Sequence, residues 1–121
     1  MIDNTTLIAL DSFITDHSIV IRNKTYICDL SLAVLMQTNI KYLRRKVQAN
    51  ISRFPEDFMI LLSEEEREKL HKSKYAFTEP GIFMLSGLIK TDRAAKISIA
   101  MVEFLVERIP GLAFSLLGSI K

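Results

Sequence analysis

The stretch "NIKYLRRKVQANISRFPEDF", residues 39–58, decides how the rest of the chain is interpreted. Five basic side chains come before Pro55, Glu56 and Asp57, with no acid among them. Apolar residues recur through the stretch at helical spacing, which predicts a helix beginning near Asn39. Its expected buried stripe consists of Ile40, Leu43, Val47 and Ile51.

The opposite arc of this predicted helix is mostly basic. It holds Lys41, Tyr42, Arg45, Lys46 and Ala49, and Arg44 lies beside the buried stripe. Pro55 disfavours helical geometry at Phe54, so we expect the helix to end near Ser52 or Arg53. A basic arc of this kind is either a solvated surface or a surface for phosphates, and spacing alone leaves both open.

A shorter helix is predicted just before it, from Asp29 to Gln37, with Asp29 as its N-cap. Its expected inward side carries Leu30, Ala33 and Val34. The residues "QTN" favour a turn between the two helices. Two short helices with a small residue in the first match the spacing of a helix-turn-helix, although many helical hairpins share it.

The flanking sequence predicts strands and further helices. "SIVIR" and "TYICD" are expected to form a hairpin around Asn23-Lys24, because Asn tolerates the positive φ of a two-residue loop. Strands are also expected in "DFMILLS" and "YAFT", and a helix in "TTLIALDSFITDH". Ser63 and Glu66 form a capping box for "EEEREKL", where acids suit the first helical turn. Two more helices are predicted at Glu79 to Lys90 and Asp92 to Arg108, the second central to the core.

Length and composition indicate one α+β domain. The chain has 121 residues, 49% of them hydrophobic, which is enough for a single core without disulfides or metal. Its single cysteine, Cys28, suits a reducing compartment, so a cytoplasmic location is expected. Neither a signal peptide nor a membrane span is expected, since the N-terminus lacks a basic region and no long apolar run exists.

Catalysis and metal binding find little support in the sequence. His17 and His71 lie far apart, and neither is part of a ligand or triad motif. The four glycines form no phosphate loop. We therefore expect no enzyme activity, no metal and no cofactor.

The wider pattern resembles the ORF6N domain, a relative of the KilA-N domains of phage and bacterial proteins. The resemblance runs from about Ile19 to Arg108 and is strongest in "RFPEDF" (residues 53–58) and "AFTEPG" (residues 76–81). It implies a compact α+β fold and a DNA-binding role, often in phage antirepressors or regulators. We divide the chain into an N-terminal segment (1–17), an ORF6N-like domain (18–108) and an apolar tail (109–121).

The matched positions divide into structural residues and candidate contacts. Phe54 and Phe58 are expected in the core, Pro55 as a helix stop, and Thr78 with Glu79 as a helix start. Basic side chains suit phosphates, and amides are able to pair with adenine edges. The candidate DNA-binding residues are Lys41, Tyr42, Arg44, Arg45, Lys46, Gln48, Asn50 and Arg53. The connection "HKSK" after "EEEREKL" is shorter than in many relatives but keeps a basic character.

Two functions follow as hypotheses. In the first, the chain is the duplex-DNA-binding domain of a phage or prophage-type regulator. In the second, it is an antirepressor-like adaptor that binds a regulator protein without touching DNA, which the net charge of only +2 favours. The apolar tail "IPGLAFSLLGSIK" is expected to pack either back on the domain's own helices or in a homodimer. Light scattering on the full chain and on a version ending at Arg108 decides between the two.

Overall fold

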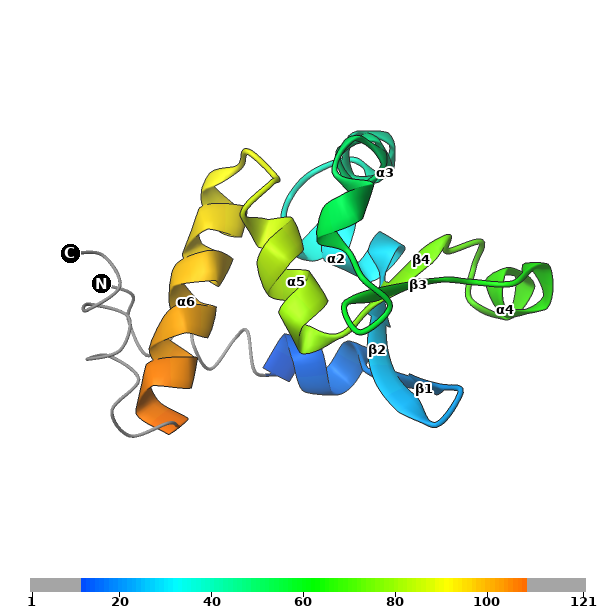
Figure 1. The fold of residues 1–121 in the computed structure, drawn as a ribbon, viewed down its shortest axis with the longest axis horizontal. Helices are drawn as coiled ribbons and strands as arrows, with labels where there is room; N and C mark the ends of the chain where they lie inside the picture. Colours follow the sequence, from blue (N-terminus) through cyan, green and yellow to red (C-terminus); the bar gives the residue numbers. More distant parts are fainter. Residues whose placement is uncertain (1–11, 109–121) are drawn as a thin grey trace.

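Four short strands form one antiparallel sheet in the computed structural model of this chain, which describes residues 12–108. The strand order is β1-β2-β4-β3. The strands are β1 (Ile19–Ile21), β2 (Lys24–Cys28), β3 (Met59–Leu61) and β4 (Tyr75–Phe77). Together with the helices around it, this sheet confirms the predicted α+β fold (Figure 1).

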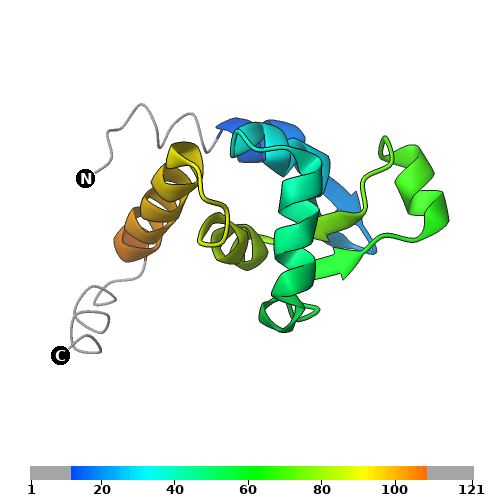
Figure 2. The ribbon, with the colours of Figure 1, turned by 90° about the horizontal axis from the view of Figure 1, so that it is seen from above.

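Helices surround the sheet and extend the molecule to one side. Residues 12–17 are helical, and a short 3-10 helix, η1 (Ile51–Arg53), follows α3. The other helices are α2 (Asp29–Leu35), α3 (Ile40–Ala49), α4 (Glu64–Lys69), α5 (Glu79–Ser86) and α6 (Asp92–Arg108). α4 and α6 lie at opposite ends of the molecule (Figures 1 and 2).

The prediction that α6 is central to the core is wrong. α6 packs beside α5 at one end of the molecule (Figure 1), and its buried residues among positions 92–103 are Ala94, Ile97 and Ala100. Ile99 on the same helix is 46% exposed. Because α6 lies at the end of the fold, part of its apolar surface is exposed to solvent.

The sheet has an apolar cluster on each face, as alternating side chains in strands require. Tyr75 and Phe77 of β4 point into the larger cluster, which also takes in residues of α2, α3, α5 and α6. Ala76, between them, belongs to the smaller cluster with Tyr26 and Cys28. Phe54 is buried as predicted, and its ring packs edge to face on that of Phe77, with the two ring centroids 5.8 Å apart.

The β1–β2 hairpin forms as predicted, but its loop lies one residue earlier than expected. Ile21 pairs with Lys24, so the loop is Arg22-Asn23. Both residues have positive φ, 51° and 67°, as a two-residue hairpin loop of the favoured kind requires. Arg22 is unusual at such a position, and its guanidinium is held by Glu66 through two hydrogen bonds of 2.7 and 3.1 Å.

Several predicted helix starts are confirmed. Ser63 and Glu66 form the capping box at α4, and the Thr78 hydroxyl caps α5 by accepting from the Gly81 amide. Gly81 lies against the backbone of Phe58, where an added Cβ would fall 1.9 Å from the carbonyl oxygen. The "TEPG" part of the motif therefore brings the start of α5 directly onto the segment before β3.

The predicted tail, the predicted dimer contact and most of the N-terminal segment involve residues outside the described part of the chain. The tail of residues 109–121, and with it the predicted dimer contact, lies outside it, as do residues 1–11. The proposed domain boundaries stay predictions. Within residues 12–108, the helices are too short or too polar for any of them to cross a bilayer.

Candidate nucleic-acid interface

The basic helix α3 begins where the sequence predicted. The Asn39 side chain accepts a 2.7 Å hydrogen bond from the backbone N–H of Tyr42, which caps the helix. Leu43 and Val47 are fully buried, and Ile40 packs against the core from a half-buried position. These contacts fix the rotation of α3 about its own axis and leave the arc opposite Leu43 facing outward.

The end of α3 differs from the prediction. The α-helix ends at Ala49 and continues as η1, whose last residue is Arg53. Ile51 was expected in the buried stripe but is 48% exposed. Asn50, the C-cap of α3, leaves helical geometry with φ −127° and ψ 31°, so Ile51 no longer lies on the line set by Leu43 and Val47.

The buried side of the first helix of the pair, α2, agrees with the predicted one only at Ala33. Leu32, Ala33 and Met36 face the core, whereas Val34 is 74% exposed. Asp29 is not the N-cap: Cys28 holds that position, and the Asp29 side chain is fully buried. A cap residue would place its carboxylate at the helix end, whereas Asp29 sends it to partners elsewhere in the chain.

The turn between the helices has the geometry of a helix end closed by a left-handed residue. Gln37 takes φ 54°, and the Thr38 amide donates to the Ala33 carbonyl at 3.0 Å. α3 then runs in a clearly different direction from α2 (Figure 2). The pair therefore has the helix-turn-helix-like arrangement that the spacing predicted.

The outward arc of α3 presents positive charge. Lys41 and Arg45 are exposed, and Lys46 and Tyr42 are half-buried. Arg45 and Lys46 place their charged groups 6.0 and 5.6 Å from the centroid of the Tyr42 ring, close enough for a weak cation–π attraction. None of these three basic residues forms an ion pair within residues 12–108, and neither does the exposed Arg53.

Arg44, the fourth basic residue of α3 that was predicted to contact DNA, has a partner within the chain. Its Nε donates to the buried Asp29 carboxylate at 2.9 Å, and its Nη2 donates to the backbone carbonyl of Lys72 at 3.2 Å. The guanidinium compensates a charge that is fully withdrawn from water. Arg44 therefore ties α3 to α2 and to the segment before β4.

The two amide side chains predicted to contact bases also have partners in the chain. The Gln48 amide donates to the Tyr75 hydroxyl, and Asn50 Nδ2 donates to the Lys46 carbonyl at 2.9 Å. Gln48 stays exposed and Asn50 half-buried. The base contacts of both residues stay predictions, and each would have to share or give up its present hydrogen bond.

The α4–β4 loop, residues 70–74, is a basic element beside α3 that the candidate list did not contain. His71 and Lys72 are exposed, and Lys74 is half-buried with its ammonium 5.3 Å from the centroid of the Tyr75 ring. The sequence carried one signal, the basic run "HKSK". Its placement depends on contacts between residues far apart in the chain, which local patterns do not reveal.

Burial determines the chemistry of the single cysteine, Cys28. Burial raises the pKa of the Cys28 thiol, which disfavours the thiolate that reactive cysteines need. Among residues 12–108, no three His, Cys, Asp or Glu side chains gather in a way that would hold a metal ion.

Comparison with known proteins gives one match. The family model of the ORF6N domain matches residues 16–88, more than half of the chain. The matched region contains the whole sheet, α2 to α5 and the basic helix, and it ends before α6. No curated protein and no solved structure matches this chain.

Proposed function

This chain belongs to the ORF6N domain family, and from that premise we propose that it is the DNA-binding domain of a phage or prophage-type regulator. The observation that carries the proposal is the outward arc of α3. Lys41, Arg45 and Lys46 lie there on a helix whose rotation is fixed by buried residues, and they have no acidic partner in the described region.

The arrangement suits a helix that lies against duplex DNA. A helix of ten residues is long enough to enter a major groove. Phosphate contacts from Lys and Arg supply most of the affinity of such complexes, and they position the helix so that neighbouring side chains reach base edges. The charged groups of Arg45 and Lys46 both lie within about 6 Å of the centroid of the Tyr42 ring, so the tyrosine is part of the same surface.

Charge reversal on α3 tests the proposal. The double variant Arg45→Glu with Lys46→Glu is expected to weaken binding to generic duplex DNA by roughly 100-fold, because two phosphate contacts become repulsive. Fluorescence anisotropy over a range of salt concentrations measures it, and the wild-type affinity should fall steeply as salt increases.

A matched control separates this surface from net charge. Lys24→Glu with Lys96→Glu changes the charge equally at exposed positions on β2 and α6, and we expect it to keep most of the affinity. Thermal melting confirms that both variants fold. Equal binding by wild type and the α3 variant would reject this surface.

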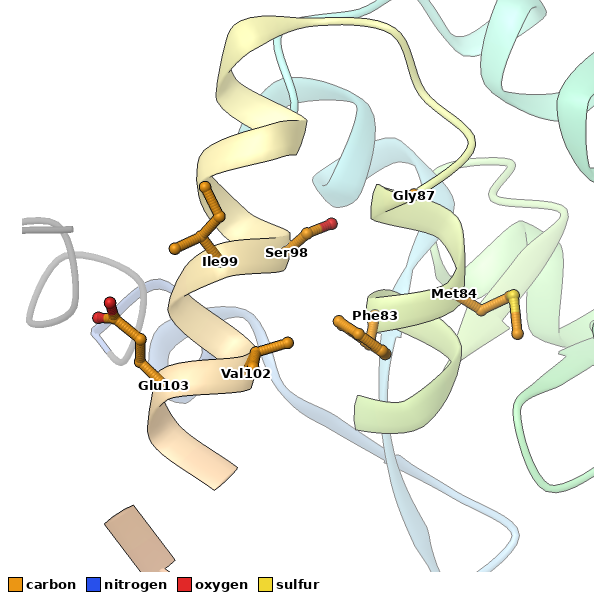
Figure 3. Close-up of a pocket in the computed structure, with 7 residues that line it drawn as sticks. All are labelled: Phe83, Met84, Gly87, Ser98, Ile99, Val102 and Glu103. Atoms are coloured by element: carbon orange, nitrogen blue, oxygen red, sulfur yellow. The ribbon is translucent and has the colours of Figure 1, made fainter. Parts of the chain in front are cut away.

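The alternative, an antirepressor-like protein-interaction module, is favoured by a different part of the molecule. An open, mostly apolar hollow of about 410 Å³ lies between α5 and α6 (Figure 3). Phe83 and Ile99, which line it, are 38% and 46% exposed. Absence of any shift of duplex DNA at low salt, together with a defined partner whose binding is lost in Ile99→Asp, would support this function instead.

We also propose that the chain has no enzymatic activity, needs no cofactor and acts in the cytoplasm. The buried, unpaired Cys28 supports a reducing compartment, and cell fractionation tests the location. The homodimer stays a prediction, to be decided by the light-scattering comparison already described.

A further inference from the structure

The α4–β4 loop, residues 70–74, is held in one shape by backbone hydrogen bonds on both of its sides. The Lys72 amide donates to the Arg67 carbonyl at 2.8 Å, and the Ser73 amide donates to the Leu70 carbonyl at 3.0 Å. The carbonyl of Lys74 accepts from the Leu62 amide at 3.0 Å. The loop is therefore attached both to α4 and to the residue that follows β3.

The loop is also attached to α3, through the buried Asp29–Arg44 pair. Arg44 donates to the Lys72 carbonyl at 3.2 Å and to the Asp29 carboxylate at 2.9 Å. The same carboxylate accepts from the backbone amides of Lys74 and Tyr75, each at 3.3 Å. One buried carboxylate thus sets the position of the loop relative to the basic helix.

The backbone of the loop adopts a conformation that its residues disfavour. His71 and Lys72 have φ values of 55° and 65°, and left-handed geometry costs about 1 to 2 kcal/mol for each residue other than glycine. Such conformations persist where surrounding contacts determine them, and they concentrate at functional sites. The side chains of His71 and Lys72 are both exposed.

The loop and the start of β4 lie against one flank of α3. Arg44 and Gln48, on one flank of the helix, contact Lys72 and Tyr75 respectively. Lys41 and Arg45 are their neighbours on the helix surface at three-residue spacing. The Lys74 ammonium lies 5.3 Å from the centroid of the Tyr75 ring, and the hydroxyl of the same ring accepts from Gln48 of α3.

We propose that the α4–β4 loop is a second phosphate-binding element, with Lys72 and Lys74 contacting the same duplex as α3. The inference rests on the proposed function of α3 and adds to it a second, rigidly attached contact. The neighbouring helix α4 is acidic, but two of its glutamates are paired, Glu65 with Lys69 and Glu66 with Arg22. The loop itself carries no acid.

The test removes two charges from the loop without disturbing its backbone. Asn tolerates positive φ far better than Lys does, so Lys72→Asn leaves the strained position at least as stable, and Lys74→Gln keeps most of the packing on Tyr75. The control Lys24→Gln with Lys96→Gln removes the same charge at exposed positions on β2 and α6. All variants are measured as full chains with a random-sequence 20-base-pair duplex.

The loop variant is expected to bind roughly tenfold or more weakly than the control at 0.1 M salt. The slope of log affinity against log salt should fall by about two, since each lost phosphate contact removes about 0.9. Melting temperatures of both variants should stay at the wild-type value or above it.

The outcomes separate the two proposals. In one outcome the wild type binds duplex DNA, Arg45→Glu with Lys46→Glu abolishes binding, and the loop variant matches its control in affinity and salt slope. The proposal for the loop is then overturned, and the proposal for α3 is supported. If the wild-type chain binds no duplex at low salt, both are overturned. A lower affinity with an unchanged salt slope also overturns the loop as a phosphate contact.

Discussion

Two ion pairs hold the segment from β3 to β4 from different sides, and they differ in bond length, in the number of hydrogen bonds and in burial. Arg22 and Glu66 join the hairpin loop to α4 through two hydrogen bonds, the shorter 2.7 Å, with side chains 50% and 24% exposed. Arg44 and Asp29 join α3 to α2 through one bond of 2.9 Å, with side chains 27% and 0% exposed.

Bond geometry and burial rank these pairs in opposite orders. The outer pair is shorter and bidentate, which is the stronger arrangement in isolation. Water screens it, however, and exposed pairs contribute little to stability. The inner pair contains a carboxylate that has lost its water entirely, so removing one of its donors leaves a buried charge with less compensation. The comparison therefore indicates that burial, more than hydrogen-bond length, determines how much each ion pair contributes to the stability of the fold.

Replacing Asp29 should give the largest effect. Asp29→Ala removes the acceptor for Arg44 and for the amides of Lys74 and Tyr75, and we expect a loss of about 3 to 5 kcal/mol of unfolding free energy. Urea denaturation measures it. Asp29→Asn is the matched control, because its side-chain oxygen still accepts from the two amides, and it should lose less. A loss of less than about 1 kcal/mol of unfolding free energy in Asp29→Ala would contradict the view that the buried pair contributes more than the exposed one.

Replacing Arg44 should have an intermediate effect. Arg44→Gln leaves the Asp29 carboxylate with two backbone donors at 3.3 Å, and because Arg44 is 27% exposed we expect a loss of about 2 kcal/mol. The double variant with Asp29→Asn completes a thermodynamic cycle. A coupling energy of at least about 1 kcal/mol is expected for residues in direct contact, and additive losses would show that the pair is not a unit.

Local sequence rules predicted the elements of the fold and failed where distant residues intervene. The capping box at Ser63, the cap at Thr78 and the start of α3 all depend on residues within one helical turn. Asp29 was misassigned because an Asp before a helical pattern is typical of an N-cap. Its actual partners are 15 to 46 residues away, and no local pattern encodes them.

The candidate site shows the same division. The outward positions of Lys41 and Arg45 follow from helical periodicity around Leu43 and Val47, so the sequence was sufficient to predict them. Arg44 and Gln48 lie on the flank that meets the α4–β4 loop and β4, and only the tertiary structure reveals their partners. The loop beside α3 could not be assigned from "HKSK" alone, since a basic run is usually a solvated surface.

The outer pair should have the smallest effect on stability and a distinct pH dependence. The hydrogen bond from Arg22 is the main cause that lowers the pKa of Glu66 from its ordinary 4.5 to about 2. A lowered carboxyl pKa stabilises the fold fully above pH 4.5, and the contribution disappears as pH falls through 2. Glu66→Gln keeps an acceptor for the Ser63 amide in the capping box, and it removes the charge together with one of the two oxygens that accept from Arg22. Thermal melting from pH 7 to pH 2 should show a small, constant difference from wild type above pH 4.5 that shrinks to nothing near pH 2. Glu68→Gln, on the same helix and without an ion pair in the described region, is the control for the loss of one negative charge. A difference at pH 7 as large as that of Asp29→Ala would mean that solvent screens the outer pair far less than its exposure implies, and the ranking by burial would fail.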